Sequence, residues 1–346
     1  MLIADGKSLE MIHSCLIIGC GRIAGSMDNI DQLKPLYIKS HSMCFDSNES
    51  INIIGYVDID IEAARDLSNK YNVSYFSDSL NDALVSLKPD FISVCTPDSS
   101  HFEVVHKILT SEYCPRLIFL EKPALTSKED FLKISQLAKQ SDVSIIVNHT
   151  RRFDDNYKLL KNIIDSKEFG ECLRIDCWYY NGWVHNGVHL VDTLQYLFDD
   201  KLTLINFIDC NHNQNNSLDT NLQGRFLLEN CAADVFINCM DEKNYQLFEL
   251  DFKFTKGRIR VENFEERFII ENVFVNEINE RVLDFKILDS IDSSKINKNA
   301  PIVNAANVII DILENTEKHD DYSIDAAKNT METIWNIQEK YNNEFK

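Results

Sequence analysis

The chain has 346 residues, and its 35 Lys and Arg residues are outnumbered by 55 Asp and Glu residues, which gives a formal net charge of −20. Nucleic-acid binding requires clustered cations that contact phosphates, and the longest basic run in this chain is Arg151-Arg152. We therefore exclude a general nucleic-acid binder and expect any bound phosphate to be small and held locally. The hydrophobic share of 44% is typical of a globular chain rather than a disordered one.

The length favours two domains, because single cores rarely extend beyond about 250–300 residues. No stretch approaches the roughly 18 uninterrupted apolar residues of a membrane span, so we expect no membrane partner. The ten cysteines include no Cys-x-x-Cys pair, which argues against a zinc ribbon or a redox dithiol. Thiols in a chain of this size indicate a reducing compartment, and we expect a cytoplasmic protein.

In residues 1–150, short apolar strands alternate with helices. Strands that are apolar on both faces predict a parallel sheet covered by helices on both sides, which is the doubly wound, or Rossmann, pattern. The predicted strands are residues 15–18, 51–57, 91–94, 117–120 and 144–147, and the predicted helices are 61–71, 100–109 and 127–139.

In residues 151–346 the pattern changes to that of an α+β domain. Successive strands separated by turn residues predict a large, mainly antiparallel open sheet. We expect helices at 152–165, 188–198, 301–315 and 323–341, and strands at 172–180, 202–209, 224–228, 232–238, 248–254, 258–262, 268–273 and 282–288. The last helices are candidates for packing back on the first domain. The predicted fold class is therefore α/β, with a Rossmann domain followed by this α+β domain.

A glycine-rich segment after the first strand matches the dinucleotide fingerprint Gly-x-Gly-x-x-Gly/Ala. It reads Gly19-Cys20-Gly21-Arg22-Ile23-Ala24-Gly25, and we expect it to follow a strand and to open a helix. Gly19 permits a tight turn, Gly21 lets the backbone approach a pyrophosphate, and Ala24 allows close packing. We expect the pyrophosphate to lie on the N-terminus of that helix.

The second strand ends in Asp58, which is placed to accept hydrogen bonds from the adenosine ribose. Asp58 comes 37 residues after Gly21, where about 20 is usual, so we expect an insertion over residues 26–50. A carboxylate without an adjacent cation would repel a 2′-phosphate and favours NAD. Arg22 is the residue that leaves NADP as the alternative.

Three further polar segments follow predicted strands, at the edge where open α/β sheets bind ligands. They are the turn 95–101, the tripeptide Glu121-Lys122-Pro123, and residues 148–153. Together with Gly187-Val188-His189-Leu190-Val191-Asp192, they make the chain resemble the Gfo/Idh/MocA family of sugar and cyclitol oxidoreductases. The resemblance extends from Gly19 to the last helix and depends on the ordered combination of motifs.

The resemblance implies that one set of residues lines the nicotinamide and the reaction centre: Thr96, Pro97, His101, Glu121 and Lys122. It also suggests a cis peptide bond between Lys122 and Pro123. Hydride transfer at an alcohol carbon requires proton transfer at its oxygen, which a positioned side chain performs. We assign that role to Lys122. We also expect Arg22 and Ile23, in the glycine-rich segment, to contact the cofactor.

His189 is the second predicted catalytic residue, because it can share the proton and hold the substrate hydroxyl. Many members of the family carry an Asp four residues earlier, where this chain has His185. We expect His185 to replace a carboxylate contact to the substrate; the alternative is that it lies outside the site. The i, i+4 spacing of the two histidines suits a metal, but the Glu of His-Glu-x-x-His and a third ligand are missing, so we expect no metal.

The predicted substrate contacts are Asn148, Arg152 and Trp183. The arginine is suited to an anionic group, and an aromatic ring can lie against a sugar face, although packing in the core is an equal alternative for Trp183. At the substrate end of the site, the cations that a diphosphate needs would come from Arg151, Arg152 or a lysine that the motifs do not identify, so uncharged sugars and cyclitols rank slightly ahead of sugar nucleotides.

These features predict an NAD-dependent oxidoreductase that acts on a secondary hydroxyl or keto carbon of a sugar, cyclitol or sugar nucleotide. Two alternatives stay open, a non-catalytic ligand sensor and a reductase of a non-sugar diol, imine or enone. The expected partner is a small-molecule substrate. The family resemblance further implies that residues 151–346 form the domain for substrate binding and oligomerisation, with copies of the chain in a homodimer or homotetramer through the C-terminal sheet.

Overall fold

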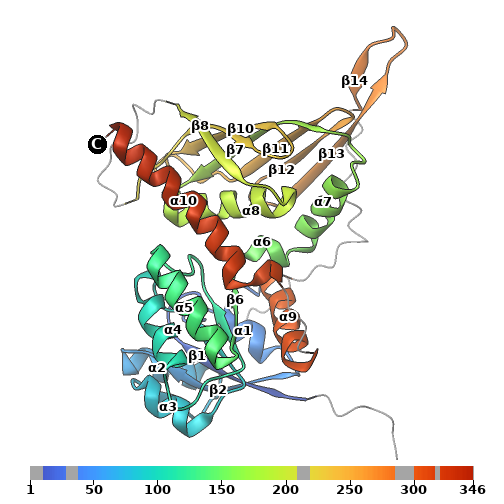
Figure 1. Cartoon of the computed structure of the whole chain (residues 1–346). Coiled ribbons are helices and arrows are strands. Elements are labelled where there is room, and N and C mark those ends of the chain that lie inside the picture. Colours follow the sequence, from blue (N-terminus) through green and yellow to red (C-terminus); the bar gives the residue numbers. More distant parts are fainter. Residues whose placement is uncertain (1–10, 29–37, 209–218, 285–299, 316–319, 346) are drawn as a thin grey trace, which may run out of the picture. The chain divides into compact units, whose positions relative to one another are not determined.

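The computed structural model describes residues 11–28, 38–208, 219–284, 300–315 and 320–345. The chain divides into two compact units (Figure 1). Unit 1 comprises Met1–Thr150 and Asn299–Ala326, and unit 2 comprises Arg151–Lys298 and Ala327–Lys346. The helix over Pro301–Asn315 therefore belongs to unit 1, and most of the last helix belongs to unit 2.

Unit 1 contains a parallel six-stranded sheet with the order β3-β2-β1-β4-β5-β6. This is the doubly wound order, so the Rossmann prediction is confirmed. The strands are β1 (His13–Ile18), β2 (Ile51–Val57), β3 (Phe76–Ser77), β4 (Phe91–Val94), β5 (Leu117–Leu120) and β6 (Ser144–Val147). Their centres are buried on both faces, as their apolar sequences require.

Helices flank this sheet (Figure 1). They are α1 (His41–Asp46), α2 (Ile61–Lys70), α3 (Leu80–Leu87), α4 (His101–Leu109), α5 (Lys128–Ser141) and α9 (Pro301–Asn315). The predicted starts of α2 and α5 hold, because Asp60 and Ser127 accept hydrogen bonds from the backbone N–H groups of Glu62 and Asp130. We did not predict α1, β3 or α3 from the sequence.

The glycine-rich fingerprint does not open a helix, which corrects our prediction. Residues 21–27 form successive turns, in which the N–H groups of Gly25 and Ser26 both donate to the carbonyl of Gly21 at 3.2 Å. Gly25 has a φ of +134°, which a right-handed helix cannot accommodate. A phosphate in this turn would therefore be held by turn N–H groups, without the helix N-terminus that we expected.

Helix α1 lies inside the segment that we predicted as an insertion. Its residues 41–45 are buried, and its first N–H groups, those of His41 and Ser42, donate to the carbonyls of Ile23 and Ala24 at 3.0 Å. Residues 38 and 40–45 are thus part of the core of unit 1, while residues 29–37 of the predicted insertion lie outside the described residues.

Unit 2 contains an eight-stranded sheet with the order β14-β13-β12-β11-β7-β10-β9-β8. All neighbouring pairs are antiparallel except β7 with β10, so the predicted mainly antiparallel sheet is confirmed. Its strands are β7 (Cys172–Tyr180), β8 (Leu202–Phe207), β9 (Gly224–Leu228), β10 (Ala233–Met240), β11 (Glu249–Phe254), β12 (Gly257–Glu262), β13 (Arg267–Val275) and β14 (Arg281–Leu283). Part of the last predicted strand, residues 285–288, lies outside the described residues.

The helices of unit 2 are α6 (Thr150–Phe153), α7 (Asp155–Asp165), α8 (Val188–Phe198) and most of α10 (Ile324–Phe345). The single helix predicted over 152–165 is interrupted at Asp154, whose side chain caps α7 by accepting from the N–H of Asn156 at 2.7 Å. Helices α8 and α10 lie along one face of the sheet (Figure 1). Burial alternates along β10, β11 and β12, as expected for a sheet with one face in the core.

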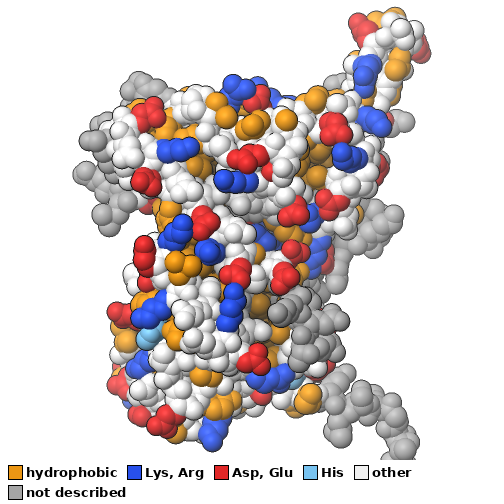
Figure 2. Space-filling model, in the orientation of Figure 1, with side chains coloured by type: hydrophobic (Ala, Val, Ile, Leu, Met, Phe, Trp, Pro, Cys, Tyr) orange, Lys and Arg blue, Asp and Glu red, His pale blue; other side chains and the backbone are white. Residues whose placement is uncertain are grey.

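The surface charges, the helices and the cysteines of the described residues can be compared with what the composition indicated about nucleic acid, membranes and disulfides. On the face shown in Figure 2, Lys and Arg side chains are interspersed with Asp and Glu side chains. Within the described ranges, no helix is both long enough and apolar enough to cross a membrane. The nine cysteines in those ranges are all free thiols, and Cys210 lies outside them.

Phe91 provides a test of the core of unit 1. Its ring is fully buried and meets Phe45 edge to face, with the ring centroids 5.4 Å apart. We predict that Phe91→Ala lowers the free energy of unfolding by about 3–5 kcal/mol in urea titrations. As a control, Ile59→Ala at a side chain that is 98% exposed should change it by less than about 0.5 kcal/mol. A cost below about 1 kcal/mol for Phe91→Ala would contradict this packing.

Candidate functional site

The glycine-rich turn lies against the end of β4. Gly19 has a φ of +87°, and a Cβ at this position would lie 2.7 Å from the backbone of Cys95 and Thr96, so only glycine fits. At Gly21, by contrast, a Cβ would meet nothing within 4 Å. The turn is therefore closed on the side of the sheet and open beside Gly21, as required for close approach of a phosphate.

Asp58 is fixed beside this turn by backbone donors. One carboxylate oxygen accepts from the N–H of Cys20 at 2.6 Å, and the other accepts from the N–H of Asp60 at 2.9 Å. The carboxylate is half-buried, while Ala24 is fully buried and Arg22 is exposed. The structure thus places a carboxylate at the end of β2, next to the fingerprint, as the sequence predicted.

The carboxylate of Glu121 is the centre of a buried hydrogen-bond network at the adjoining strand ends. Its Oε1 accepts from Asn148 Nδ2 at 2.6 Å and from His41 Nε2 at 2.8 Å. Its Oε2 accepts from the backbone N–H of Lys122 at 3.2 Å. The other ring nitrogen of His41 lies 2.6 Å from Ser93 Oγ. Three separate segments of unit 1 are therefore joined at one carboxylate, and Ser93 of β4 is linked to it through His41.

Charge reinforces this network. Burial opposes ionisation of Glu121, but hydrogen bonds from His41 and Asn148 and the charge of Lys122 hold the pKa of Glu121 below its ordinary value. Burial also opposes the charged form of His41, yet Cys95 and Glu121 outweigh it and raise the pKa of His41 to about 10. The pair is therefore an imidazolium and a carboxylate at neutral pH.

The network fixes the backbone from which Lys122 extends. Lys122 is half-buried, and the peptide bond between Lys122 and Pro123 is cis, as the resemblance suggested. His101 braces the same turn, because its Nδ1 lies 3.0 Å from the carbonyl of Pro123 and its Nε2 lies 2.9 Å from the carbonyl of Thr96. His101 is buried, so the structure gives it a positioning role between the two turns.

Two buried polar atoms at this edge have no hydrogen-bond partner among the described residues. They are Thr96 Oγ1, which follows β4, and Asn148 Oδ1, which follows β6. Buried polar atoms are normally paired, so each is a candidate to contact a ligand. With the open flank at Gly21 and the fixed carboxylate of Asp58, these atoms fit a dinucleotide laid along the carboxyl ends of the strands.

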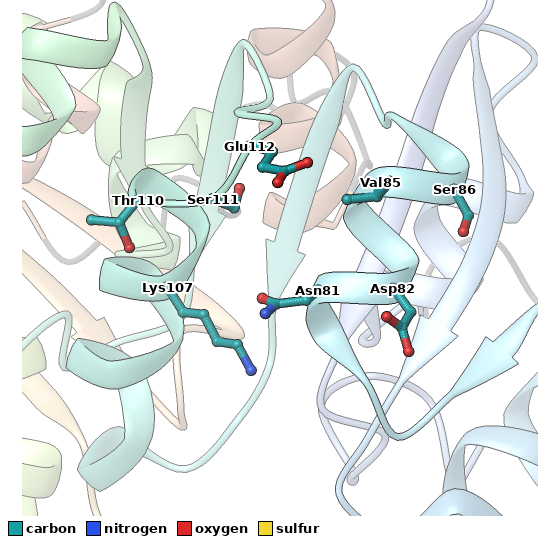
Figure 3. A pocket seen from close by; sticks show the side chains of 8 residues that line it. All are labelled: Asn81, Asp82, Val85, Ser86, Lys107, Thr110, Ser111 and Glu112. Atoms are coloured by element: carbon teal, nitrogen blue, oxygen red, sulfur yellow. The ribbon is translucent and has the colours of Figure 1, made fainter.

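A separate hollow of about 500 Å³ lies between α3 and α4 (Figure 3). It is lined by Lys107, by the acidic Asp82 and Glu112, and by small polar side chains. None of the predicted site residues lines it, and we assign it no role.

In unit 2, the predicted His185 and His189 lie at the turn that leads into α8. Trp183–Gly187 form a π-helical turn, in which the N–H of Gly187 donates to the carbonyl of Gly182 at 3.0 Å. Such turns are frequent at functional sites. His185 is exposed and His189 is half-buried.

The carboxylate of Asp219 holds the start of this turn. No motif in the sequence pointed to Asp219 as part of the site. Its carboxylate accepts from the N–H groups of Val184 at 3.0 Å and His185 at 2.7 Å. A carboxylate therefore contacts the backbone at His185, although it comes from a distant part of the chain. In the described residues, no group of three His, Cys, Asp or Glu side chains is placed to hold a metal ion.

Arg152, predicted to bind the substrate, is paired inside unit 2. Its Nε lies 3.0 and 3.1 Å from the two carboxylate oxygens of Asp192, and its Nη2 lies 2.9 Å from Oδ1. Thr330 Oγ1 donates to the same carboxylate at 2.8 Å, and the pair is buried. The guanidinium thus holds α8 to α6, and substrate binding by Arg152 has no support in these contacts.

Arg151 is likewise engaged within unit 2. It pairs with Glu265, which also accepts from Tyr157 Oη at 2.8 Å, and its guanidinium lies 3.9 Å from the ring centroid of Phe248. Both arginines of the only basic pair are therefore satisfied by neighbouring acidic residues.

Trp183 was predicted to contact the substrate, and the structure places it in the core instead. It is 0% exposed, its indole N–H donates to the carbonyl of Ile334 at 3.2 Å, and its ring stacks on Phe226. A side chain enclosed in this way has no surface left for a ligand. The half-buried Tyr180, three residues earlier in the chain, contacts the exposed Phe264.

The site residue that the sequence reasoning missed is His41. It stands outside the recognised motifs, in a stretch that we interpreted as an insertion. A signal was present in the apolar pattern after Ser40, where a capping serine precedes a short run containing Met43, Cys44 and Phe45.

The fold and this carboxyl edge define a Rossmann domain with a site suited to a dinucleotide. Residues 13–149 match the Gfo/Idh/MocA model, described as the oxidoreductase family with an NAD-binding Rossmann fold. The match covers the Rossmann domain and makes this part of the chain similar to that family, in agreement with the resemblance. Inositol 2-dehydrogenase 1 from Mycolicibacterium vanbaalenii is 29% identical over 139 residues, which cover 37% of this chain and 40% of that protein. The match thus spans less than half of the relative's length.

Two solved structures share the fold over nearly the whole chain. The WlbA dehydrogenase from Chromobacterium violaceum, in complex with NADH and UDP-GlcNAcA, has a TM-score of 0.73 at 16% identity, covering 99% of this chain and 97% of that chain. The transcriptional regulator Gal80p from Kluyveromyces lactis also has a TM-score of 0.73, at 14% identity, covering 97% and 93%. At such identities the likeness shows the fold alone.

The His41–Glu121 pair predicts a pH-dependent stability. Because the pKa of His41 is raised, its contribution is fully present below the unfolded value of about 6.5 and is lost as the pH rises through about 10. The lowered pKa of Glu121 acts in the opposite sense: its contribution is present above about pH 4.3 and is lost as the pH falls further.

We therefore expect His41→Phe to lower the free energy of unfolding by about 3–5 kcal/mol near pH 6. That difference from wild type should shrink as the pH is raised toward about 10. Urea titrations across this range measure the difference, and a value that stays constant would contradict the ion pair.

Trp183→Ala tests the corrected position of the indole. Loss of a fully buried, stacked ring should lower the free energy of unfolding by about 3–5 kcal/mol. Phe264→Ala is the matched control, because this aromatic ring is 43% exposed, and it should cost less than about 1 kcal/mol. Equal small costs for both variants would show that Trp183 is not enclosed.

Proposed function

We propose that the chain is an NAD-dependent oxidoreductase that transfers a hydride between nicotinamide and a secondary hydroxyl or keto carbon of an uncharged sugar or cyclitol. The observation that carries this proposal is the Glu121 network. It fixes the backbone of Lys122 at the carboxyl edge of the six-stranded sheet, where the glycine-rich turn also lies. The inositol dehydrogenases among the relatives support the substrate class.

NAD is the proposed cofactor in preference to NADP. Asp58 is held by two backbone N–H groups and presents a carboxylate where the adenosine ribose is expected. A 2′-phosphate at that point would meet a negative charge. Arg22 lies in the glycine-rich turn and is exposed. If NADP were the cofactor, Arg22 is the residue that would contact its 2′-phosphate.

In this proposal the bound dinucleotide supplies the hydride acceptor. Lys122 takes the proton from the substrate hydroxyl as the carbon is oxidised and returns it in the reverse reaction. Thr96 Oγ1 and Asn148 Oδ1 offer hydrogen bonds to bound ligands, while Glu121 and His101 position the Lys122 turn. For His189 and His185, roles in sharing the proton and holding a hydroxyl stay proposals from the family resemblance.

A neutral substrate follows from the pairing of the two arginines. A nucleotide sugar carries two phosphates that need cations or N–H groups, and Arg151 and Arg152 are both engaged by acidic residues. The complex of WlbA with UDP-GlcNAcA makes a sugar nucleotide the competing substrate class.

We also propose that copies of the chain associate through the face of the eight-stranded sheet opposite α8 and α10. Side chains on this sheet include a chain of ion pairs in which Asp176 contacts Lys253, and Lys253 and Arg258 contact Asp251. Such a row of paired charges suits a polar contact between identical sheets. Light scattering on purified protein tests the homodimer or homotetramer against a monomer.

Replacement of Lys122 tests the proposed chemistry. With a panel of inositols, neutral sugars and UDP-sugars, we expect NADH formation with a neutral polyol. We expect Lys122→Ala to lower kcat by about 10²- to 10⁴-fold while NAD binding persists. Lys107→Ala, on the exposed side of α4 in the hollow of Figure 3, is the control and should leave kcat within about twofold.

Two outcomes would contradict the proposal. Turnover of UDP-sugars alone would overturn the neutral substrate class. Tight binding of NAD and a sugar without any turnover would favour a ligand sensor; one solved structure of this fold, Gal80p, is named a transcriptional regulator.

A further inference from the structure

His41 occupies a position between the two turns of the proposed site. Its backbone N–H donates to the carbonyl of Ile23, in the glycine-rich turn, at 3.0 Å. Its ring bonds Glu121, in the Glu-Lys-Pro turn, at 2.8 Å. One residue therefore connects the part of unit 1 that is suited to a pyrophosphate with the part that carries Lys122.

The surroundings of His41 leave its ring little freedom. The side chain is fully buried, and its ring centroid lies 5.8 Å from that of Phe45 and 5.0 Å from that of Phe119. The Ser93 hydroxyl lies 2.6 Å from the second ring nitrogen. Packed interiors transmit small displacements, so a movement of the Ile23 turn would be passed through α1 to Glu121.

We propose that His41 is a positioning residue that couples the glycine-rich turn to the Glu121-Lys122 turn, so that a dinucleotide held on the first turn orders the second. This inference rests on the proposed function. It adds a role for a residue outside the dinucleotide fingerprint and outside the Glu-Lys-Pro segment.

The charge of the pair strengthens the coupling. The titratable groups that face the imidazole are Glu121 and the thiol of Cys95, and together they raise the pKa of His41 to about 10 against the effect of burial. The bond to Glu121 is then charge-assisted, which makes it stronger than a bond between neutral groups. A neutral replacement of the same size should weaken the link while filling the same space.

The test is hydrogen–deuterium exchange of the full chain, measured by mass spectrometry with and without ADP-ribose, which has the pyrophosphate of NAD but lacks the nicotinamide that would itself contact Lys122. In wild type, we expect ADP-ribose to slow exchange in the peptide that covers residues 19–27 and in the peptide that covers 119–125. In His41→Phe, ADP-ribose should still slow exchange in 19–27, but its effect on 119–125 should fall at least about tenfold. His41→Gln, which keeps an N–H for Glu121, should show an intermediate effect and serves if the Phe variant does not fold.

His13→Gln is the matched control. His13 is also buried in unit 1 and also faces a glutamate, with its Nε2 3.5 Å from Glu314 Oε1, but it lies at the amino end of β1. ADP-ribose should slow exchange in both peptides of this variant as in wild type. Protection of 119–125 at the wild-type level in folded His41→Phe and His41→Gln would overturn the coupling, as would wild-type protein in which ADP-ribose protects 19–27 alone. Wild-type protein in which neither NAD nor ADP-ribose slows exchange in either peptide would overturn the proposed function, and the coupling with it.

Discussion

The buried carboxylate of Glu121 is the constraint on which the rest of unit 1 depends. A carboxylate removed from water is stable only when its oxygens are hydrogen-bonded and its charge is matched. Those conditions require an imidazole from α1, an amide from the end of β6 and the N–H of Lys122 at one place. The position of Lys122 is thus set by the desolvation of its neighbour, and three segments distant in the sequence converge at the carboxyl edge of the sheet.

The strongly acidic composition is compatible with the ligands that we propose for the two units. A charge of −20 is compatible with a bound dinucleotide because the open flank of the Gly21 turn offers backbone N–H groups and needs no basic patch. In unit 2 the only adjacent pair of arginines serves internal ion pairs with Asp192 and Glu265. Cations are therefore used for internal structure, and this arrangement favours a substrate that carries hydroxyl groups without phosphates.

The sequence was sufficient for features set by local patterns. Apolar runs located β2, β4, β5 and β6, and the residues before α2 and α5 marked their starts. Features set by distant contacts were not accessible: the partner of Arg152, the enclosure of Trp183 by Phe226 and Ile334, and the contact of His41 with Glu121 all depend on packing between remote segments. The missing helix after Gly21 has a local cause in Gly25, but the fingerprint is shared by chains that do form the helix.

The central claim is that the edge organised by Glu121 supports hydride transfer from a neutral polyol. The most direct measurement uses inositol deuterated at its carbinol carbons, incubated with the purified chain and NAD, followed by mass spectrometry of the dinucleotide. The account predicts one deuterium in the reduced nicotinamide for each oxidised inositol, and no labelled dinucleotide with Lys122→Ala. Reduced nicotinamide without deuterium, or labelling that persists at the wild-type rate in Lys122→Ala, would contradict it.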